Sequence, residues 1–166
     1  MAIVKTNFYT QDLNQFAPHR MRGEYLDWGL NAEVIEVEID ASQGATPVYA
    51  GDALTIVATS KGKLKVKAAG AADPVFGFAL FNPKHTSFKA GDILSCLRDG
   101  GVISMVTEAT VVAGATVAYN ATDGSIATVT QGGSPIGIAL AAVTAKEGGT
   151  LIPVLVQKPA LVAPAA

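Results

Sequence analysis

Two short segments of the chain alternate between apolar and charged residues, which is the pattern of a half-buried β-strand. In Glu33–Asp40 (EVIEVEID), three aliphatic side chains alternate with acidic ones. In Lys61–Lys67 (KGKLKVK), a lysine occupies every second position, and Leu64 and Val66 lie between the lysines. Because successive side chains of a strand point to opposite faces, each segment is predicted to be a strand with one apolar and one charged face.

Turn signals containing Gly, Asp, Asn or Pro recur between the apolar segments. They occur at residues 50–52, 73–74, 82–83, 90–92, 99–101, 123–124 and 132–133. Short strands separated by such turns are typical of a β-sandwich or barrel. Composition agrees, since 17 glycines supply turn conformations and only 16% of residues are charged, against about a quarter in typical domains. The sequence therefore predicts an all-β fold, a small β-barrel or sandwich.

An internal repeat is the strongest organisational feature of the chain. VYAGDALTIV, DPVFGFALFN and FKAGDILSCL are followed in the same order by VVAGATVAYN, GSPIGIALAA and KEGGTLIPVL. The matching glycines lie 63, 60 and 58 residues further along in the second copy. We predict two duplicated halves, about 45–97 and 107–157, that pack together because one half alone leaves an apolar face uncovered.

Composition divides the chain into three regions. Residues 32–157 carry the β signals, and residues 158–166 form a Pro/Ala tail that we expect to be flexible. Residues 1–31 show no helix or strand period but hold several large aromatics and two arginines. Such a segment is predicted to be an extended N-terminal arm laid on another surface, its own barrel or a neighbouring subunit. The side chains concerned are Phe8, Tyr9, Phe16, Arg20, Arg22, Tyr25 and Trp28.

Several function classes are disfavoured by what the sequence lacks. A formal net charge of −2 gives no concentrated positive surface for nucleic acid, and no apolar run reaches the ~20 residues of a membrane helix. His19 and His85 have no ligand-spaced partner, so neither a metal nor another cofactor is expected. The single cysteine, Cys96, is predicted to be a buried strand residue.

Catalytic signatures are absent from the sequence as well. No GxSxG nucleophile motif and no glycine-rich phosphate-binding motif occurs, so the chain is predicted not to be an enzyme. The carboxylates of Glu36 and Glu38 are two residues apart on one strand face. A pair of this kind could serve acid–base chemistry, but the regular acidic stripe to which it belongs favours a solvated or cation-paired face.

The two charged stripes are candidates for an interaction. Glu36 and Glu38 could face Lys61, Lys63 and Lys65 across strands of one chain or between subunits. Opposed charges of this kind set register and partner choice more than affinity. The alternative is two unrelated solvated faces. A nucleic-acid surface is disfavoured because no aromatic side chain is interleaved with these lysines.

Five segments, taken in order, resemble the structural cement (decoration) proteins of tailed-bacteriophage capsids. They are AGD at 50–52, DPVFGFALFNPK at 73–84, TSFKAGDIL at 86–94, VVAGATVAYNATDGSI at 111–126 and SPIGIALAAV at 134–143. The resemblance implies a protein that binds the outer surface of an HK97-like shell and stabilises the expanded shell by bridging capsid subunits. It implies as partners the major capsid protein and further copies of the chain, in a dimer or trimer.

On this interpretation the protein is made in the host cytoplasm and resides on the virion. The expected capsid or subunit interface comprises Phe8, Tyr9, Phe16, Arg20, Arg22, Tyr25, Trp28, Glu36, Glu38, Lys61, Lys63 and Lys65. For Tyr25 and Trp28, packing against the protein's own barrel is an equal alternative. Two other functions remain open: a β-sandwich module for carbohydrate or host attachment, which needs exposed aromatics, and a small hydrolase with dispersed catalytic residues.

Overall fold

A computed structural model describes residues 21–26, 30–85, 87–129 and 135–157, and it confirms the predicted all-β class. The strands of this part are β1 (Tyr25–Leu26), β2 (Glu33–Ile39), β3 (Val48–Tyr49), β4 (Ala53–Ser60), β5 (Lys63–Ala68), β6 (Gly77–Ala79), β7 (Ser87–Phe88), β8 (Ile93–Asp99), β9 (Val102–Thr107), β10 (Thr116–Tyr119), β11 (Ile126–Thr128), β12 (Pro135–Ala139) and β13 (Thr150–Val156). One 3-10 turn, Ala41–Gln43, follows β2.

The first half of the chain forms a closed barrel with strand order β2-β5-β4-β6-β8. Its pairs are antiparallel except for β2 and β5, which run parallel and close the barrel. The predicted strand Glu33–Asp40 contains β2, and the predicted strand Lys61–Lys67 covers most of β5, but its first two residues, Lys61 and Gly62, form a turn instead. Val37, Ile39 and Val66 point into the barrel and are buried, because the apolar face of each strand lies inside.

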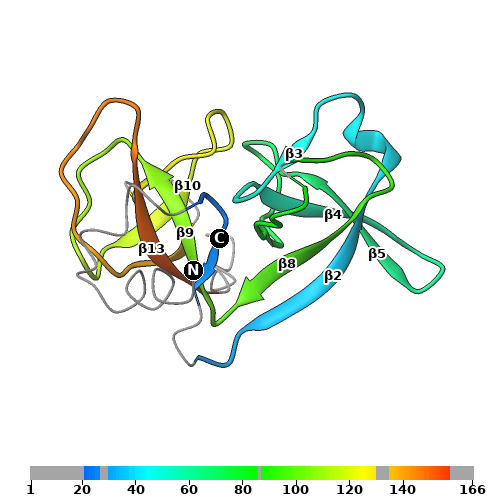
Figure 1. Ribbon diagram of the computed structural model, residues 1–166, viewed down its shortest axis with the longest axis horizontal. Coiled ribbons are helices and arrows are strands. Elements are labelled where there is room, and N and C mark those ends of the chain that lie inside the picture. The colour runs from blue at the N-terminus through cyan, green and yellow to red at the C-terminus, as the bar shows by residue number, and fades with distance from the viewer. Residues whose placement is uncertain (1–20, 27–29, 86, 130–134, 158–166) are drawn as a thin grey trace, which may run out of the picture.

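The second half, together with β1 from the N-terminal part of the chain, forms a six-stranded sheet with strand order β1-β9-β13-β12-β10-β11. All its pairs are antiparallel. Figure 1 shows the barrel on the right and the strands β9, β10 and β13 of this sheet on the left. Strand β8 runs from the barrel toward the sheet, and a turn at residues 99–101 continues it into β9.

One of two apolar clusters joins the barrel to the sheet. Ala53, Phe78 and Leu97 lie in one row across β4, β6 and β8, and all three are buried in a cluster with the apolar side chains of the sheet. The ring of Phe78 meets that of Tyr119 edge to face, with centroids 5.8 Å apart. Because the sheet covers this side of the barrel, the two parts share this cluster, while the barrel holds a second apolar cluster in its own interior.

The barrel and the sheet use the same hydrogen-bonding scheme. The strand order β2-β8-β6-β4-β5 of the barrel corresponds, strand by strand, to the order β9-β13-β12-β10-β11 of the sheet. The bonds Gly51 N to Ala79 O and Gly114 N to Ala139 O are both 2.7 Å long. This is the correspondence that the repeat in the sequence would produce, while the duplication itself stays a prediction. Two further matched pairs, each 2.9 Å, are Ala79 N to Asp52 O with Ala139 N to Ala115 O, and Leu80 N to Ser95 O with Leu140 N to Pro153 O.

Candidate functional site

The β4–β5 hairpin carries the predicted lysines and projects from the barrel at the right of Figure 1. Its two-residue loop, Lys61-Gly62, joins the paired residues Ser60 and Lys63. Both loop residues have positive φ, 52° and 76°, as in a type I′ turn, whose twist matches that of the flanking strands. Residues from Ile56 to Lys63 are all exposed, so the end of the hairpin is open to solvent.

Glu38 on β2 connects this hairpin to the neighbouring strand. The parallel register places Glu38 opposite Lys65, whose Nζ donates to Glu38 Oε1 at 3.0 Å. Lys63 Nζ lies 3.6 Å from Glu38 Oε2. The hydrogen bond from Lys65 lowers the pKa of Glu38 and raises the pKa of Lys65. Of the arrangements open from the sequence, pairing across strands of one chain therefore holds for Glu38.

The remaining members of the two stripes are not brought together. Asp40 accepts from Ser42 N at 2.9 Å and caps the 3-10 turn. Lys67 approaches Asp73 at 3.8 Å instead of an acidic residue of β2. Glu36 and Lys61 are exposed and have no side-chain partner among the residues that the structure describes. The lysine stripe thus ends in a cationic tip, Lys61 and Lys63. The sequence alone did not distinguish this tip from Lys65, which is paired with Glu38.

Exposed aliphatic side chains lie at the base of the same hairpin. Ile56 is 48% exposed and Val57 is 40% exposed, although both are large and apolar. The ladder between β4 and β5 shifts register between Ile56 and Ala58, so Val57 is an extra residue that forms a β-bulge. The strand pattern from sequence did not reveal this apolar surface, because a bulge interrupts the two-residue period.

Arg22, which was predicted to contact the capsid or another subunit, is bound within its own chain. Its Nη2 donates to Asp52 Oδ1 at 2.7 Å and to the carbonyl oxygen of Gly124 at 3.0 Å. Asp52 belongs to the barrel and Gly124 to the β10–β11 loop, so one guanidinium joins the two parts of the fold. We call Arg22, Asp52 and Gly124 the Arg22 junction.

Glycines make the space for this junction. A Cβ added at Gly51 would lie 2.7 Å from Arg22 Cγ, and one at Gly124 would collide with the guanidinium. Gly51 and Gly124 also have positive φ, 83° and 71°, where a side chain is strained. The sequence motif around Gly51 indicated a turn correctly, but it did not indicate that an arginine packs against it. Asp52 and Gly124 were therefore missed as partners.

Residues 21–26, which belong to the predicted N-terminal arm, form part of the described fold. In β1, Tyr25 pairs with Ile103 of β9, and its half-buried ring packs against the shared core. Gly23 N donates to Ser104 O at 2.8 Å, and Gly23 O accepts from Phe81 N at 2.8 Å. The other predicted arm contacts, which lie outside the described residues, are Phe8, Tyr9, Phe16, Arg20 and Trp28.

Cys96 is buried in the barrel, as its sequence pattern predicted. Desolvation raises the pKa of its thiol to about 12. Since only the thiolate reacts, Ellman's reagent at about pH 8 should modify the native protein at least about a hundredfold more slowly than the protein unfolded in guanidinium. Absorbance at 412 nm gives both rates, and rapid modification of the native protein would show that the barrel opens readily.

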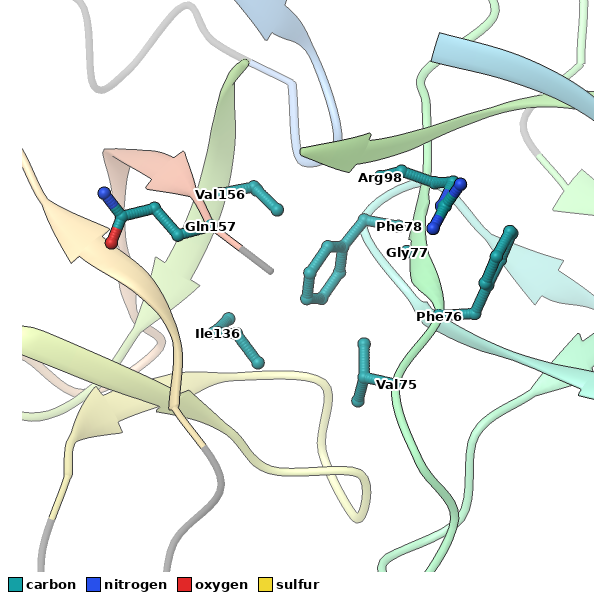
Figure 2. Close-up of a pocket in the computed structure, with 8 residues that line it drawn as sticks. All are labelled: Val75, Phe76, Gly77, Phe78, Arg98, Ile136, Val156 and Gln157. Atoms are coloured by element: carbon teal, nitrogen blue, oxygen red, sulfur yellow. The ribbon is translucent and has the colours of Figure 1, made fainter. Parts of the chain in front are cut away.

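A pocket between the barrel and the sheet is too small for a typical ligand. Its cavity volume is about 10 Å³, which leaves room for no more than about one water molecule. Figure 2 shows Phe78, Ile136 and Val156 at its apolar side, and Arg98 beside the ring of Phe76, with the guanidinium carbon 4.7 Å from the ring centroid. Arg98 also donates to Glu33 Oε1 at 2.7 Å, so its charge is paired.

Two further features bear on the type of site. Within the described ranges, no group of three or more His, Cys, Asp or Glu side chains is placed to hold a metal ion. No helix in that part of the chain is long and apolar enough to cross a membrane. What these residues do present is a projecting hairpin with exposed lysines and exposed aliphatic side chains, and this is the candidate contact surface.

The fold and this surface define an all-β protein whose candidate site is a contact surface. A family model described as structural cement protein (E217 gp24/Pam3 gp6) matches residues 18–157, and the chain belongs to this phage structural cement protein family. The family consists of structural phage proteins and is not an enzyme family, so the chain has a capsid-associated structural role. Virion association follows from the same membership.

One solved structure supports the fold. The crystal structure of the head fiber gp8.5 N base of bacteriophage phi29 is similar to this chain, with a TM-score of 0.51 and 11% sequence identity. The similarity covers 80% of this chain and 100% of the phi29 chain. No curated protein sequence matches the chain.

Proposed function

We propose that this protein binds the outer surface of an HK97-like capsid and stabilises the expanded shell by bridging neighbouring shell subunits. The observation that carries the proposal is the family match, which extends over both the barrel and the six-stranded sheet. A protein that binds the assembled shell and not its separated subunits favours the assembled state by mass action. Many copies, each with a modest interface, add up to a large effect through avidity.

The interface that we propose has two parts. One is the N-terminal segment, with Phe8, Tyr9, Phe16, Arg20 and Trp28 as contacts, because aromatics and arginines contribute most to interface energy. The other is the exposed charged surface of the barrel with Glu36, Lys61 and Lys63. A symmetric homo-oligomer, a dimer or trimer, would present several copies of both parts and suits a position on a capsid symmetry axis.

A carbohydrate-binding function has less support. Such sites usually present aromatic rings on an exposed platform. Phe78 and Phe88 are buried, and Tyr49, at 49%, is the one aromatic among the large hydrophobic side chains that stand exposed in the described ranges. A single exposed ring does not make a platform.

The proposal is tested by sedimenting the purified protein with expanded, undecorated heads of its phage. Saturable binding at a fixed ratio to shell subunits, with greater resistance of the heads to heat, is the expected result. The absence of binding to intact heads would contradict the proposal.

Deleting residues 1–20 tests whether the arm contributes to head binding independently of the stability of the fold. The deletion keeps Arg22 and β1, so the melting temperature should change little, while affinity for heads should fall about tenfold or more. Deletion of residues 158–166 is the matched control and should change binding less. Removal of residues 1–31 should also lower the melting temperature, because it takes away β1 and Arg22. Normal head binding by the 1–20 deletion would rule out the arm as a contact.

A further inference from the structure

The correspondence between the barrel and the sheet shows which part of the β4–β5 hairpin the fold requires. Ile56 pairs with Val66 on the barrel, and at the matching place in the sheet Tyr119 pairs with Ile126. Beyond these pairs, the barrel has nine residues, 57–65, whereas the sheet closes the same connection with six, 120–125. Residues 57–65, which we call the hairpin extension, are therefore longer than this arrangement of strands needs.

The two connections also differ in how their polar groups are satisfied. In the shorter loop, Asn120 Nδ2 donates to Asp123 Oδ2 at 3.0 Å, and Asp123 Oδ1 accepts from Ser125 N at 2.9 Å. The polar side chains of Asn120 and Asp123 are thus hydrogen-bonded within the loop. In the hairpin extension, by contrast, Lys61 has no partner among the described residues, and Lys63 is 57% exposed with one ion pair of 3.6 Å.

The chemistry of the hairpin extension limits what it can bind. Lys65 is paired closely with Glu38, so the unsatisfied charge is concentrated at Lys61 and Lys63. Ile56 and Val57 expose aliphatic surface at the base of the extension. Two cations near the tip of a hairpin whose base exposes a small apolar surface match a protein patch of carboxylates with apolar side chains further along it. A single-stranded nucleic acid would call for aromatic stacking residues, and the extension has none.

We infer that the hairpin extension is a docking element for an acidic surface of the capsid shell protein, with Lys61 and Lys63 as its charged contacts. This inference rests on the proposed function and names the chemistry of the partner at one part of its interface. The type I′ turn places Lys61 at the end of a projecting hairpin and Lys63 follows on β5, so the fold holds both lysines close together before they bind, which lowers the entropy lost on binding. Because both lysines are exposed, salt should weaken their attraction to the acidic surface.

The experiment compares two charge-matched double variants in binding to expanded heads. Lys61→Glu/Lys63→Glu reverses the tip, and Lys84→Glu/Lys146→Glu reverses two exposed lysines elsewhere on the chain. At about 0.15 M salt the tip variant should bind at least about tenfold more weakly, while the control stays within about threefold of the unaltered protein. The dependence of affinity on salt should also become shallower for the tip variant alone. The control should keep the native melting temperature, and the tip variant should stay folded with a small decrease, because Lys63→Glu replaces a largely exposed ion pair with Glu38 by a like-charge contact.

Each other outcome of this experiment has a definite meaning. If the unaltered protein binds heads and the tip variant binds equally well, the inference is wrong and the proposed function stands. An equal loss in both variants would assign the effect to net charge and also overturn the inference. If sedimentation velocity shows that the tip variant loses self-association, the extension contacts a second copy and not the shell. If the unaltered protein does not bind heads, the proposed function fails and the inference fails with it.

Discussion

Replacing Arg22 with alanine is expected to lower the free energy of unfolding by about 2–4 kcal/mol. The Arg22 side chain is 27% exposed and that of Asp52 is 16% exposed, so the ion pair between them is largely shielded from water. Removal of the guanidinium leaves the Asp52 carboxylate without its cation and leaves Gly124 O without this donor. It also removes the methylene stem of Arg22 that packs against Gly51.

The matched control is Arg98→Ala. Arg98 pairs with Glu33 at the same distance of 2.7 Å, but the two side chains are 30% and 40% exposed. Solvent screens this pair, so its loss, together with the contact to Phe76, should cost about 1 kcal/mol. Denaturant unfolding of both variants measures the difference. Equal destabilisation would mean that the Arg22 junction adds nothing beyond an ordinary surface ion pair.

A double-mutant cycle with Asp52→Asn tests the junction more finely. Asparagine retains an acceptor for Tyr49 N, which donates to Asp52 Oδ2 at 2.8 Å. The coupling between Arg22 and Asp52 should be about 1.5–3 kcal/mol. Because the barrel and the sheet share one core, both should unfold in a single transition in every variant. Separate transitions would show that the junction, and not the core, joins the two parts.

The local elements were predictable from sequence because each depends on a short pattern. Alternation in EVIEVEID indicated β2, and the glycines of the two AGD motifs indicated turns, where Gly51 and Gly91 have φ of 83° and 89°. Burial of Cys96 followed from its alternation with polar neighbours on a strand. In each case the residues that decide the conformation lie within a few positions of one another.

What the sequence could not predict depends on contacts between distant residues. The parallel pairing of β2 with β5 closes the barrel and brings Glu38 next to Lys65, although β3 and β4 lie between these strands in the chain. Arg22 lies 30 residues from Asp52 and 102 from Gly124, and no local pattern indicates these partners. Phe78 lies on the outside of the barrel and is buried because the second sheet covers it. Periodicity therefore gave the strands, while the packing of one sheet on another determined the core.

For the candidate site, the sequence indicated the residue types and the structure separated their roles. The lysine stripe divides into Lys65, which Glu38 satisfies, and the tip at Lys61 and Lys63. Alternation alone treats these lysines as equivalent, since it contains no information on which strand lies beside them. The same reasoning applies to Arg22, whose position near the aromatics suggested an external contact although its partners lie within the chain.

Replacing Gly137 with alanine is expected to destabilise the protein by about 3 kcal/mol or more. Its φ is not positive, so the reason is space: a Cβ would collide with the carbonyl oxygen of Leu155 and lie 3.2 Å from Val156 Cα. These are backbone atoms of the paired strand β13, where Gly137 lies opposite Val156. Relief would require the strands to separate, and the hydrogen bonds between them would weaken with them.

Gly77→Ala should behave in the same way. A Cβ there would lie 2.6 Å from the carbonyl oxygen of Leu97, in strand β8 of the barrel. Gly70→Ala is the control, because its nearest contact would be Asp73 Oδ2 at an ordinary 3.4 Å and its φ is not positive, so a change within about 0.5 kcal/mol is expected.

Thermal and denaturant unfolding of the three glycine variants also test the relation between the two halves. Gly77 and Gly137 occupy corresponding places, each facing a carbonyl oxygen of the strand that pairs beside it. If the halves share their packing as well as their hydrogen bonds, the two substitutions should cost similar amounts, because neither carbonyl can move without opening its ladder. A severe loss at one position with a small loss at the other would show that the correspondence is limited to the backbone. The backbone pairs Ile56–Val66 and Tyr119–Ile126, which give the hairpin extension its reference length, would still hold in that case.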